Sequence, residues 1–123
     1  GRDWIWIAGN HDPEPAMDVG GRFLETLVVG GVTFRHQPEE NAHGEIAGHL
    51  HPVARVAVRG HAVSRRCFAG DGRRMVLPAF GAYAGGLNIR HHAFAGLFGP
   101  GLMAHLLGDR RVYAFAASHC FAD

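Results

Sequence analysis

The alternation of apolar and polar positions predicts a chain built from short strands. Runs of apolar and β-branched residues are bounded by Gly, Pro, Asn and Asp, which is typical of strands joined by turns. The expected strands lie at residues 4–8, 23–29, 32–35, 45–48, 53–58, 62–68, 75–77, 87–89 and 112–116. In contrast, we expect Met103–Leu107 to form a short helix.

Two breaks between these strands carry hairpin signals. Gly30-Gly31 lies between two apolar runs and is typical of a two-residue hairpin turn. Gly70-Asp71-Gly72 separates residues 62–68 from residues 75–77 in the same way. We therefore expect two antiparallel strand pairs.

The first apolar stretch, residues 4–8, is nearly continuous instead of alternating. This pattern is typical of a strand that is buried on both faces and has a neighbour on each side. Because the stretch follows Gly1-Arg2-Asp3 directly, we expect the sequence to begin inside a domain. An unpaired edge beside this strand would favour homo-oligomers or aggregation.

Composition places the chain among globular proteins and excludes several function classes. Its 123 residues fit one domain, and 47% hydrophobic with 19% charged residues can support a core. The net charge of +1 excludes a polycationic tail, and no apolar run reaches the roughly 20 residues of a membrane span. Two cysteines are too few for a disulfide scaffold, so we expect a reduced, cytoplasmic protein.

Histidine and arginine are frequent in this sequence. There are 10 His, and all 12 basic residues are Arg. Histidine is the commonest protein ligand of transition metals and titrates near neutral pH, which favours a metal or phosphate site. A genome rich in G and C would also favour Arg over Lys, so composition leaves both explanations open.

Polar residues of the metal-ligand type follow three of the predicted strands. They are Asn10, His11 and Asp12 after residues 4–8, His36 after residues 32–35, and His49 and His51 after residues 45–48. Loops at strand ends are where sites are usually built on a rigid sheet. On an extended segment, His49 and His51 would project to the same face. Each motif alone has a plain alternative as a polar turn or as exposed histidines.

The order of these motifs resembles the calcineurin-like metallophosphoesterases, which hold two metal ions with five short motifs. The last three motifs are present here. The resemblance implies an α/β fold, with a β-sandwich flanked by helices, of which this strand-rich chain would be the carboxyl-terminal part. By the resemblance, Asn10, His36 and His49 would bind one metal ion and His51 the other. His11 would contact the scissile phosphate and assist the leaving group.

The implied chemistry needs two divalent ions. Two adjacent cations clamp the attacking and leaving oxygens of a phosphoryl centre and supply hydroxide near neutral pH. Imidazole and oxygen ligands suit Mn, Fe or Zn, and the resemblance favours Mn. The family's Asp-x-His and Gly-Asp-x-x-Asp motifs, which supply a bridging carboxylate, are absent from this sequence. Because unbridged cations repel each other, we expect residues 1–123 to bind one metal ion well and to be part of a larger domain.

Residues 4–117 are similar to the ligase-associated DNA damage response endonucleases of the PdeM type, most specifically over residues 77–88. The similarity implies cleavage of single-stranded or damaged DNA in a bacterial repair set with an ATP-dependent DNA ligase and a helicase. Arg65 and Arg66 are expected to bind substrate, because the guanidinium fork matches phosphate oxygens.

Further residues near this hairpin fit the same substrate. Arg73 and Arg74 would extend the basic cluster, and Phe80 and Tyr83 would stack on an unpaired base. The small net charge favours an alternative, in which the arginines form a solvated hairpin face and Phe80 lies in the core.

Two other functions stay open. A small-molecule phosphodiesterase would use the same residues, and its activity would respond less to salt than cleavage of long DNA. A non-catalytic scaffold on a truncated phosphoesterase fold would explain the missing motifs.

Overall fold

The structure is a computed structural model that describes residues 3–9 and 20–123. Strands β1 to β11 account for most of its regular structure. Their bounds are Ile5–Ile7, Arg22–Leu24, Thr26–Val29, Val32–Arg35, Glu45–Ala47, Pro52–Val58, His61–Gly70, Arg74–Val76, Leu87–Asn88, Met103–Leu107 and Val112–Ala116. The 3-10 helices η1 and η2 span His92–Phe94 and Ala117–His119. Within the described ranges, no helix is long and apolar enough to cross a membrane.

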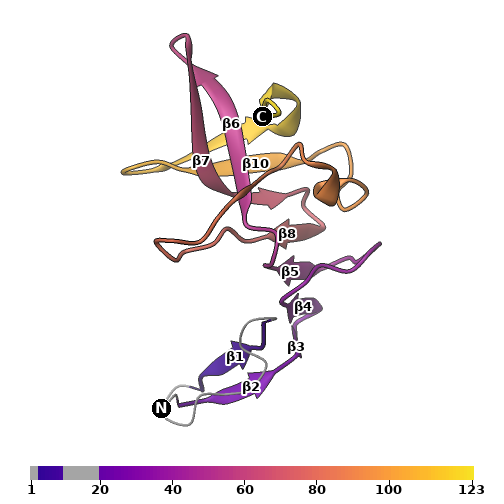
Figure 1. Ribbon diagram of the computed structural model, residues 1–123. Coiled ribbons are helices and arrows are strands. Elements are labelled where there is room, and N and C mark those ends of the chain that lie inside the picture. The colour runs from indigo at the N-terminus through magenta and orange to yellow at the C-terminus, as the bar shows by residue number, and fades with distance from the viewer. Residues whose placement is uncertain (1–2, 10–19) are drawn as a thin grey trace.

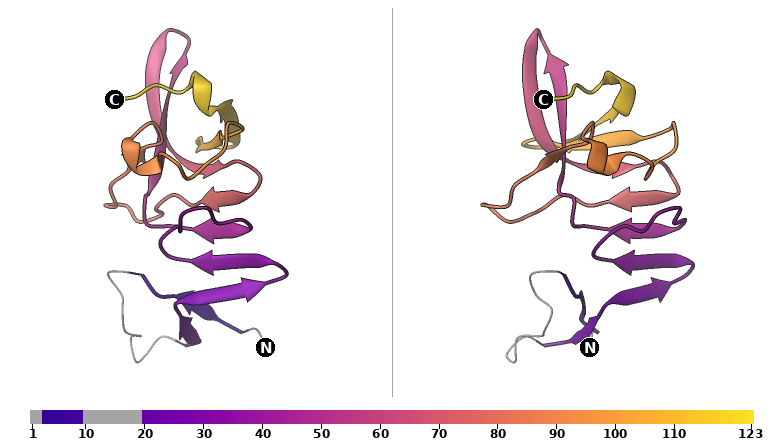
Figure 2. Two further views of the ribbon diagram at one scale, coloured as in Figure 1. Left: turned by 90° about the vertical axis from the view of Figure 1, so that its right-hand side faces the viewer. Right: turned by 45° about the vertical axis from the view of Figure 1, so that its right-hand side comes forward.

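The strands form one long ladder with a small sheet at its end (Figure 1). The order along the main sheet is β11-β10-β7-β8-β5-β4-β3, with β6 beside β7 and β9 beside β6. Strands β4, β5 and β8 run parallel to one another. Figure 2 shows β1 and β2 at one end of the molecule and the β6–β7 hairpin at the other. The expected strand-rich segment is confirmed, and the structure shows that its main sheet is mixed.

Strand β7 connects two layers and holds the core between them. Its first half pairs with β6, and its second half pairs with β10. The buried core is Ala54, Val56, Cys67, Ala69, Ile89, Ala104, Leu106 and Cys120. Small side chains allow the strands to approach closely here. Both cysteines are free, as expected, and burial, with a contribution from Cys120, raises the pKa of Cys67 to about 12.

A buried ion pair ties β5 to β8 at their amino-terminal ends. Arg74 Nη2 lies 2.6 Å from Glu45 Oε1, and both residues are almost fully buried. Arg74 also donates to the carbonyl of Leu97, and the Glu39 N–H donates to Glu45 Oε2. Arg35 Nε lies 3.3 Å from the same carboxylate. Buried charges persist when they are paired and hydrogen-bonded, so this network fixes the stagger of the parallel strands.

Both predicted hairpins are confirmed, and the structure adds two more, β6–β7 and β10–β11. Gly30 and Gly31 have φ of 56° and 81°, as a type I′ turn requires, and they join β3 to β4. Strands β7 and β8 pair across Asp71. The third turn, Arg59-Gly60, joins β6 to β7 with φ of 51° and 80°. This turn is not predictable from the sequence, because Arg seldom adopts a positive φ.

Two expectations about local structure are wrong. Met103–Leu107 is a strand, because pairing with β7 and β11 overrides the helix preference of its Met, Ala and Leu residues. Residues 4–8 are not buried on both faces. Strand β1 pairs with β2 alone in a two-stranded sheet, and Trp4 and Trp6 are 65% and 41% exposed.

Candidate metal and phosphate site

The loops that follow three parallel strands lie at the same edge of the sheet. Because β4, β5 and β8 are parallel, their carboxyl-terminal ends lie together. His36 follows β4, and Gly48-His49 follows β5. The Gly48 N–H donates to the His36 carbonyl at 2.8 Å, and the Leu77 N–H after β8 donates to the Ala47 carbonyl at 2.8 Å. The topology therefore places the predicted histidines on one edge, which we call the histidine edge.

His36 and His49 meet directly at this edge. Their Nε2 and Nδ1 atoms are 3.1 Å apart, and the rings are inclined at 74°. In the described residues, no group of three His, Cys, Asp or Glu side chains could hold a metal ion. Two nitrogens that each lie about 2.1 Å from one ion are separated by about 3.0 Å when the angle at the ion is 90° and by about 3.4 Å when it is tetrahedral. The pair therefore fits two ligand positions of one ion, and the same distance fits a hydrogen bond between neutral imidazoles.

The backbone of His49 and His51 is in the left-handed region. Their φ angles are 73° and 50°, and Leu50 between them donates to the Gly48 carbonyl. The expectation that both side chains project from an extended segment is wrong, because residues 49–50 form a bend and both histidines have a positive φ. A left-handed residue with a side chain costs about 1 kcal/mol. Strain of this kind is retained where the surroundings impose it, which is common at binding sites.

Gly9 packs against His36 at the end of β1. A Cβ atom at this position would lie 3.2 Å from His36 Nδ1, so only glycine fits without moving the ring. The predicted ligand Asn10 and the predicted catalytic His11 come next in the sequence and lie outside the described residues. Gly9, the residue directly before Asn10 in the sequence, therefore lies beside the imidazole of His36.

Arg65 and Arg66 point away from each other. They are neighbours on β7, so their side chains project to opposite faces of the strand. Both terminal guanidinium nitrogens of Arg66 donate to backbone carbonyls, Nη1 to Ala79 and Nη2 to Ala84, each at 3.0 Å. Arg66 therefore holds the loop of residues 78–86 in place. Its role and that of Arg65 in substrate binding stay predictions.

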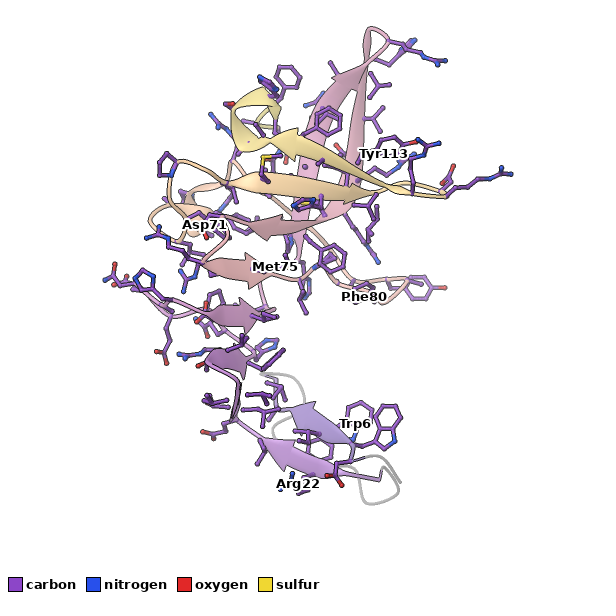
Figure 3. All side chains as sticks on the ribbon, turned by 180° about the vertical axis from the view of Figure 1, so that it is seen from behind. Trp6, Arg22, Asp71, Met75, Phe80 and Tyr113 are labelled. Atoms are coloured by element: carbon purple, nitrogen blue, oxygen red, sulfur yellow. The ribbon has the colours of Figure 1, made fainter. Side chains whose placement is uncertain are left out.

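This loop presents two aromatic side chains to solvent. Phe80 is 69% exposed, and Tyr83 is fully exposed. The alternative that Phe80 lies in the core is therefore wrong. The loop follows β8 and ends beside His51, whose carbonyl accepts from the Leu87 N–H at 2.8 Å. Figure 3 shows Phe80 on this loop, where it extends from the sheet.

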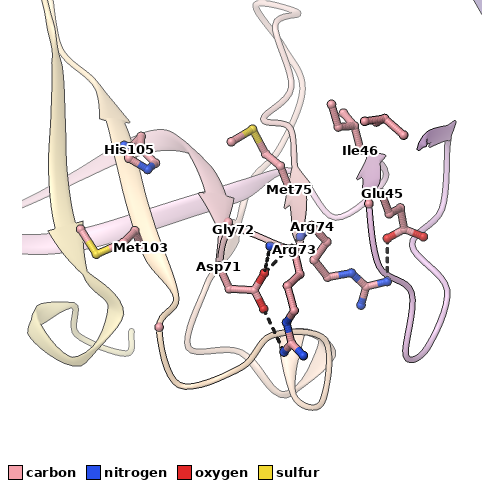
Figure 4. Close-up of a pocket in the computed structure, with 13 residues that line it drawn as sticks. Glu45, Ile46, Asp71, Gly72, Arg73, Arg74, Met75, Met103 and His105 are labelled. Carbon is pink, nitrogen blue, oxygen red and sulfur yellow. Dashed lines mark hydrogen bonds and ion pairs between the residues drawn. The ribbon is translucent and has the colours of Figure 1, made fainter. Parts of the chain in front are cut away.

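Arg73 and Arg74 do not join a basic cluster with Arg65. Arg74 is buried with Glu45, and Arg73 Nη2 lies 3.4 Å from Asp71 Oδ2 (Figure 4). These groups line a cavity of about 540 Å³. The expectation of one basic hairpin face is wrong, because Arg73 and Arg74 pair with carboxylates that their positions in the sequence do not reveal.

Asp71 organises the turn between β7 and β8. Its carboxylate accepts from the backbone N–H groups of Arg73, Arg74 and Gly99 at 2.8 to 3.1 Å. Burial alone would raise the pKa of this group, but these three hydrogen bonds, with the charge of Arg73, lower it to about 2. The ionised carboxylate is therefore structural, and it explains the conformation of the predicted turn.

A solved structure, that of a nuclease, is similar to this chain. The crystal structure of Pseudomonas putida nuclease MPE matches with a TM-score of 0.67 and 28% sequence identity. The match covers 92% of this chain and 54% of that chain, so the described fold corresponds to about half of the neighbour. No family model matches the sequence, and no curated protein matches it.

Proposed function

We propose that the chain is part of a metal-dependent phosphoesterase that cleaves phosphodiester bonds in nucleic acid. The observation that carries the proposal is the convergence of His36 and His49 at the carboxyl edge of three parallel strands. The similarity to a solved nuclease supports the reaction class.

The residues of the histidine edge have separate roles in this proposal. His36, His49 and Asn10 hold one divalent ion, and His51 holds a second together with ligands from outside this sequence. Divalent ions supply Lewis-acid activation of the phosphoryl group and a nucleophile at neutral pH. Mn suits the imidazole and amide donor set, and Fe or Zn also fits it. His11 contacts the scissile phosphate and protonates the leaving oxygen.

The substrate that fits best is single-stranded or damaged DNA. Phe80 and Tyr83 are exposed on a loop that leaves the same edge as the histidines. Exposed aromatic rings stack on unpaired bases, and duplex bases are hidden from such contact. Arg66 acts here as a positioning residue for the loop. In the cell, we propose a cytoplasmic repair role beside an ATP-dependent DNA ligase and a helicase.

Hydrolysis of a labelled single-stranded oligodeoxynucleotide with Mn²⁺ tests this function. The assay uses the 123-residue chain, alone and joined to an amino-terminal segment that carries Asp-x-His and Gly-Asp-x-x-Asp. We expect nicking by the joined protein and its loss in His49→Ala, with full activity in the control His119→Ala. His119 is exposed in η2. Equal activity of His49→Ala and the control would refute the proposal.

A further inference from the structure

Four arginines gather around one pocket far from the histidine edge. The pocket has a volume of about 680 Å³ and lies between the β6–β7 and β10–β11 hairpins. The arginines that line it are Arg59, Arg65, Arg110 and Arg111. Asp109 also lines it, so four guanidinium groups stand against one carboxylate. The volume is in the usual range for ligand sites.

Three arginines elsewhere in the chain have carboxylate partners, and the four guanidinium groups of the pocket differ from them. Arg35, Arg73 and Arg74 each pair with a carboxylate. Over residues 3–9 and 20–123, no ion pair involves any arginine of the pocket. Their charges are therefore not neutralised by the fold, and they favour an anionic occupant.

An aromatic wall accompanies this charge. Tyr113 on β11 is 48% exposed, and the guanidinium carbon of Arg111 lies 5.8 Å from its ring centroid. Gly108 permits this position, because a Cβ there would lie 2.6 Å from Tyr113 Cε2. Phe115 lines the same pocket. A planar ring beside guanidinium groups matches a base joined to a phosphate.

The turn that carries Arg59 is strained. Arg59 has a φ of 51° in a type I′ turn, where Asn or Gly would be favoured. Of the four described non-glycine residues with positive φ, two are the histidines His49 and His51. Like these two histidines, Arg59 is therefore held in a backbone conformation that is unfavourable for a residue with a side chain.

We propose that this pocket is a second binding site for a single strand of nucleic acid, with phosphates on Arg59, Arg65 and Arg111 and a base against Tyr113. The choice of a nucleic acid over other polyanions rests on the proposed function. Strand β6 connects the two sites, since it begins after His51 and ends before Arg59. Its seven residues span roughly 20 Å. A strand of several nucleotides that lies along β6 would reach both sites.

Fluorescence anisotropy of a labelled oligothymidylate tests the second site. The titration is done with the chain in EDTA, so that neither a metal ion nor hydrolysis contributes. Arg59→Asn is the informative variant, because it removes the charge and suits the turn, and its thermal midpoint should not fall. We expect binding about tenfold weaker for Arg59→Asn combined with Arg65→Gln, and a salt slope reduced by about one for each lost phosphate contact.

The matched control is Arg22→Gln combined with Arg90→Gln, which removes two exposed charges outside the pocket. This pair should bind almost like the unmodified chain. Equal affinity and salt slope in the pocket variants and the unmodified chain would overturn the proposal, as would an equal loss in the control. A metal titration of the same variants separates the two claims. If the pocket variants lose DNA binding but bind Mn²⁺ normally, the pocket is supported independently of the metal site. If His49→Ala binds Mn²⁺ normally, the proposed function is contradicted and the pocket is not.

Discussion

His36 and His49 lie 13 positions apart in the sequence, yet their Nε2 and Nδ1 atoms are 3.1 Å apart. Two parallel strands produce this contact, because β4 ends just before His36 and β5 ends just before Gly48. The Gly48 N–H binds the His36 carbonyl and locks the two loops together. The pair is therefore a product of strand register, and changes that disturb this register should disturb the site.

Gly9→Ala should weaken metal binding without changing any proposed ligand. The new methyl group would press on His36 Nδ1 at 3.2 Å and displace the imidazole. Changes that misorient a ligand typically weaken metal affinity by about tenfold or more. Isothermal titration with Mn²⁺ measures the effect, and Gly20→Ala is the control, because a Cβ there meets nothing within 4 Å. Equal affinities in the two variants would contradict the role of Gly9.

Stability should fall in acid because of Asp71. The pKa of Asp71 is about 2 in the folded chain, whereas the ordinary pKa of an aspartate side chain, which applies to the unfolded chain, is 3.8. Between these values, the unfolded chain takes up a proton that the folded chain does not, so the free energy of unfolding decreases as the pH falls from about 4 to 2. The full contribution, about 2 kcal/mol, is present above pH 4.

Urea unfolding at several pH values measures this contribution of Asp71, and Asp71→Asn should lack the pH dependence. A parallel pH profile in both proteins would refute the assignment.

Breaking the buried pair of Glu45 and Arg74 should destabilise the sheet. Glu45→Gln leaves the buried Arg74 charge without its partner at 2.6 Å. Removing one partner of such a pair costs about 3 to 5 kcal/mol. Thermal unfolding should show a large decrease for Glu45→Gln, whereas Glu40→Gln, an exposed carboxylate in the preceding loop, should have little effect. Similar midpoints would show that the pair is not structural.

Arg66→Gln should release the loop of residues 78–86. The variant loses both hydrogen bonds to the Ala79 and Ala84 carbonyls. We expect faster amide hydrogen exchange in this loop and weaker binding of single-stranded DNA, with unchanged Mn²⁺ affinity. If DNA binding is lost while the loop stays protected, Arg66 contacts the phosphate itself and is not a positioning residue.

The sequence predicts local features of this fold better than distant ones. The Gly30-Gly31 hairpin is predictable because its turn chemistry lies within two residues. The strand at Met103–Leu107 is not, since its pairing partners are distant and its own residues favour a helix. The parallel order of β4, β5 and β8 also depends on distant partners.

The arginines show the same difference within the candidate site. Sequence proximity groups Arg65 with Arg74, but burial assigns Arg74 to Glu45. The pocket instead joins Arg65 to Arg111, which lies on another hairpin. The family resemblance predicts that His36 and His49 bind one metal ion, whereas only the structure gives their contact and the bend that carries His49.

Titration of the chain with Mn²⁺ tests the central claim most directly. His49→Gly is the best variant, because it removes the imidazole with its Cβ and glycine accepts the φ of 73° without strain. We predict that the unmodified chain and His119→Ala bind one ion with equal affinity, and that His49→Gly binds it at least about tenfold more weakly while it unfolds at the same or a higher temperature. Equal Mn²⁺ binding by all three proteins would contradict a metal site at His36 and His49.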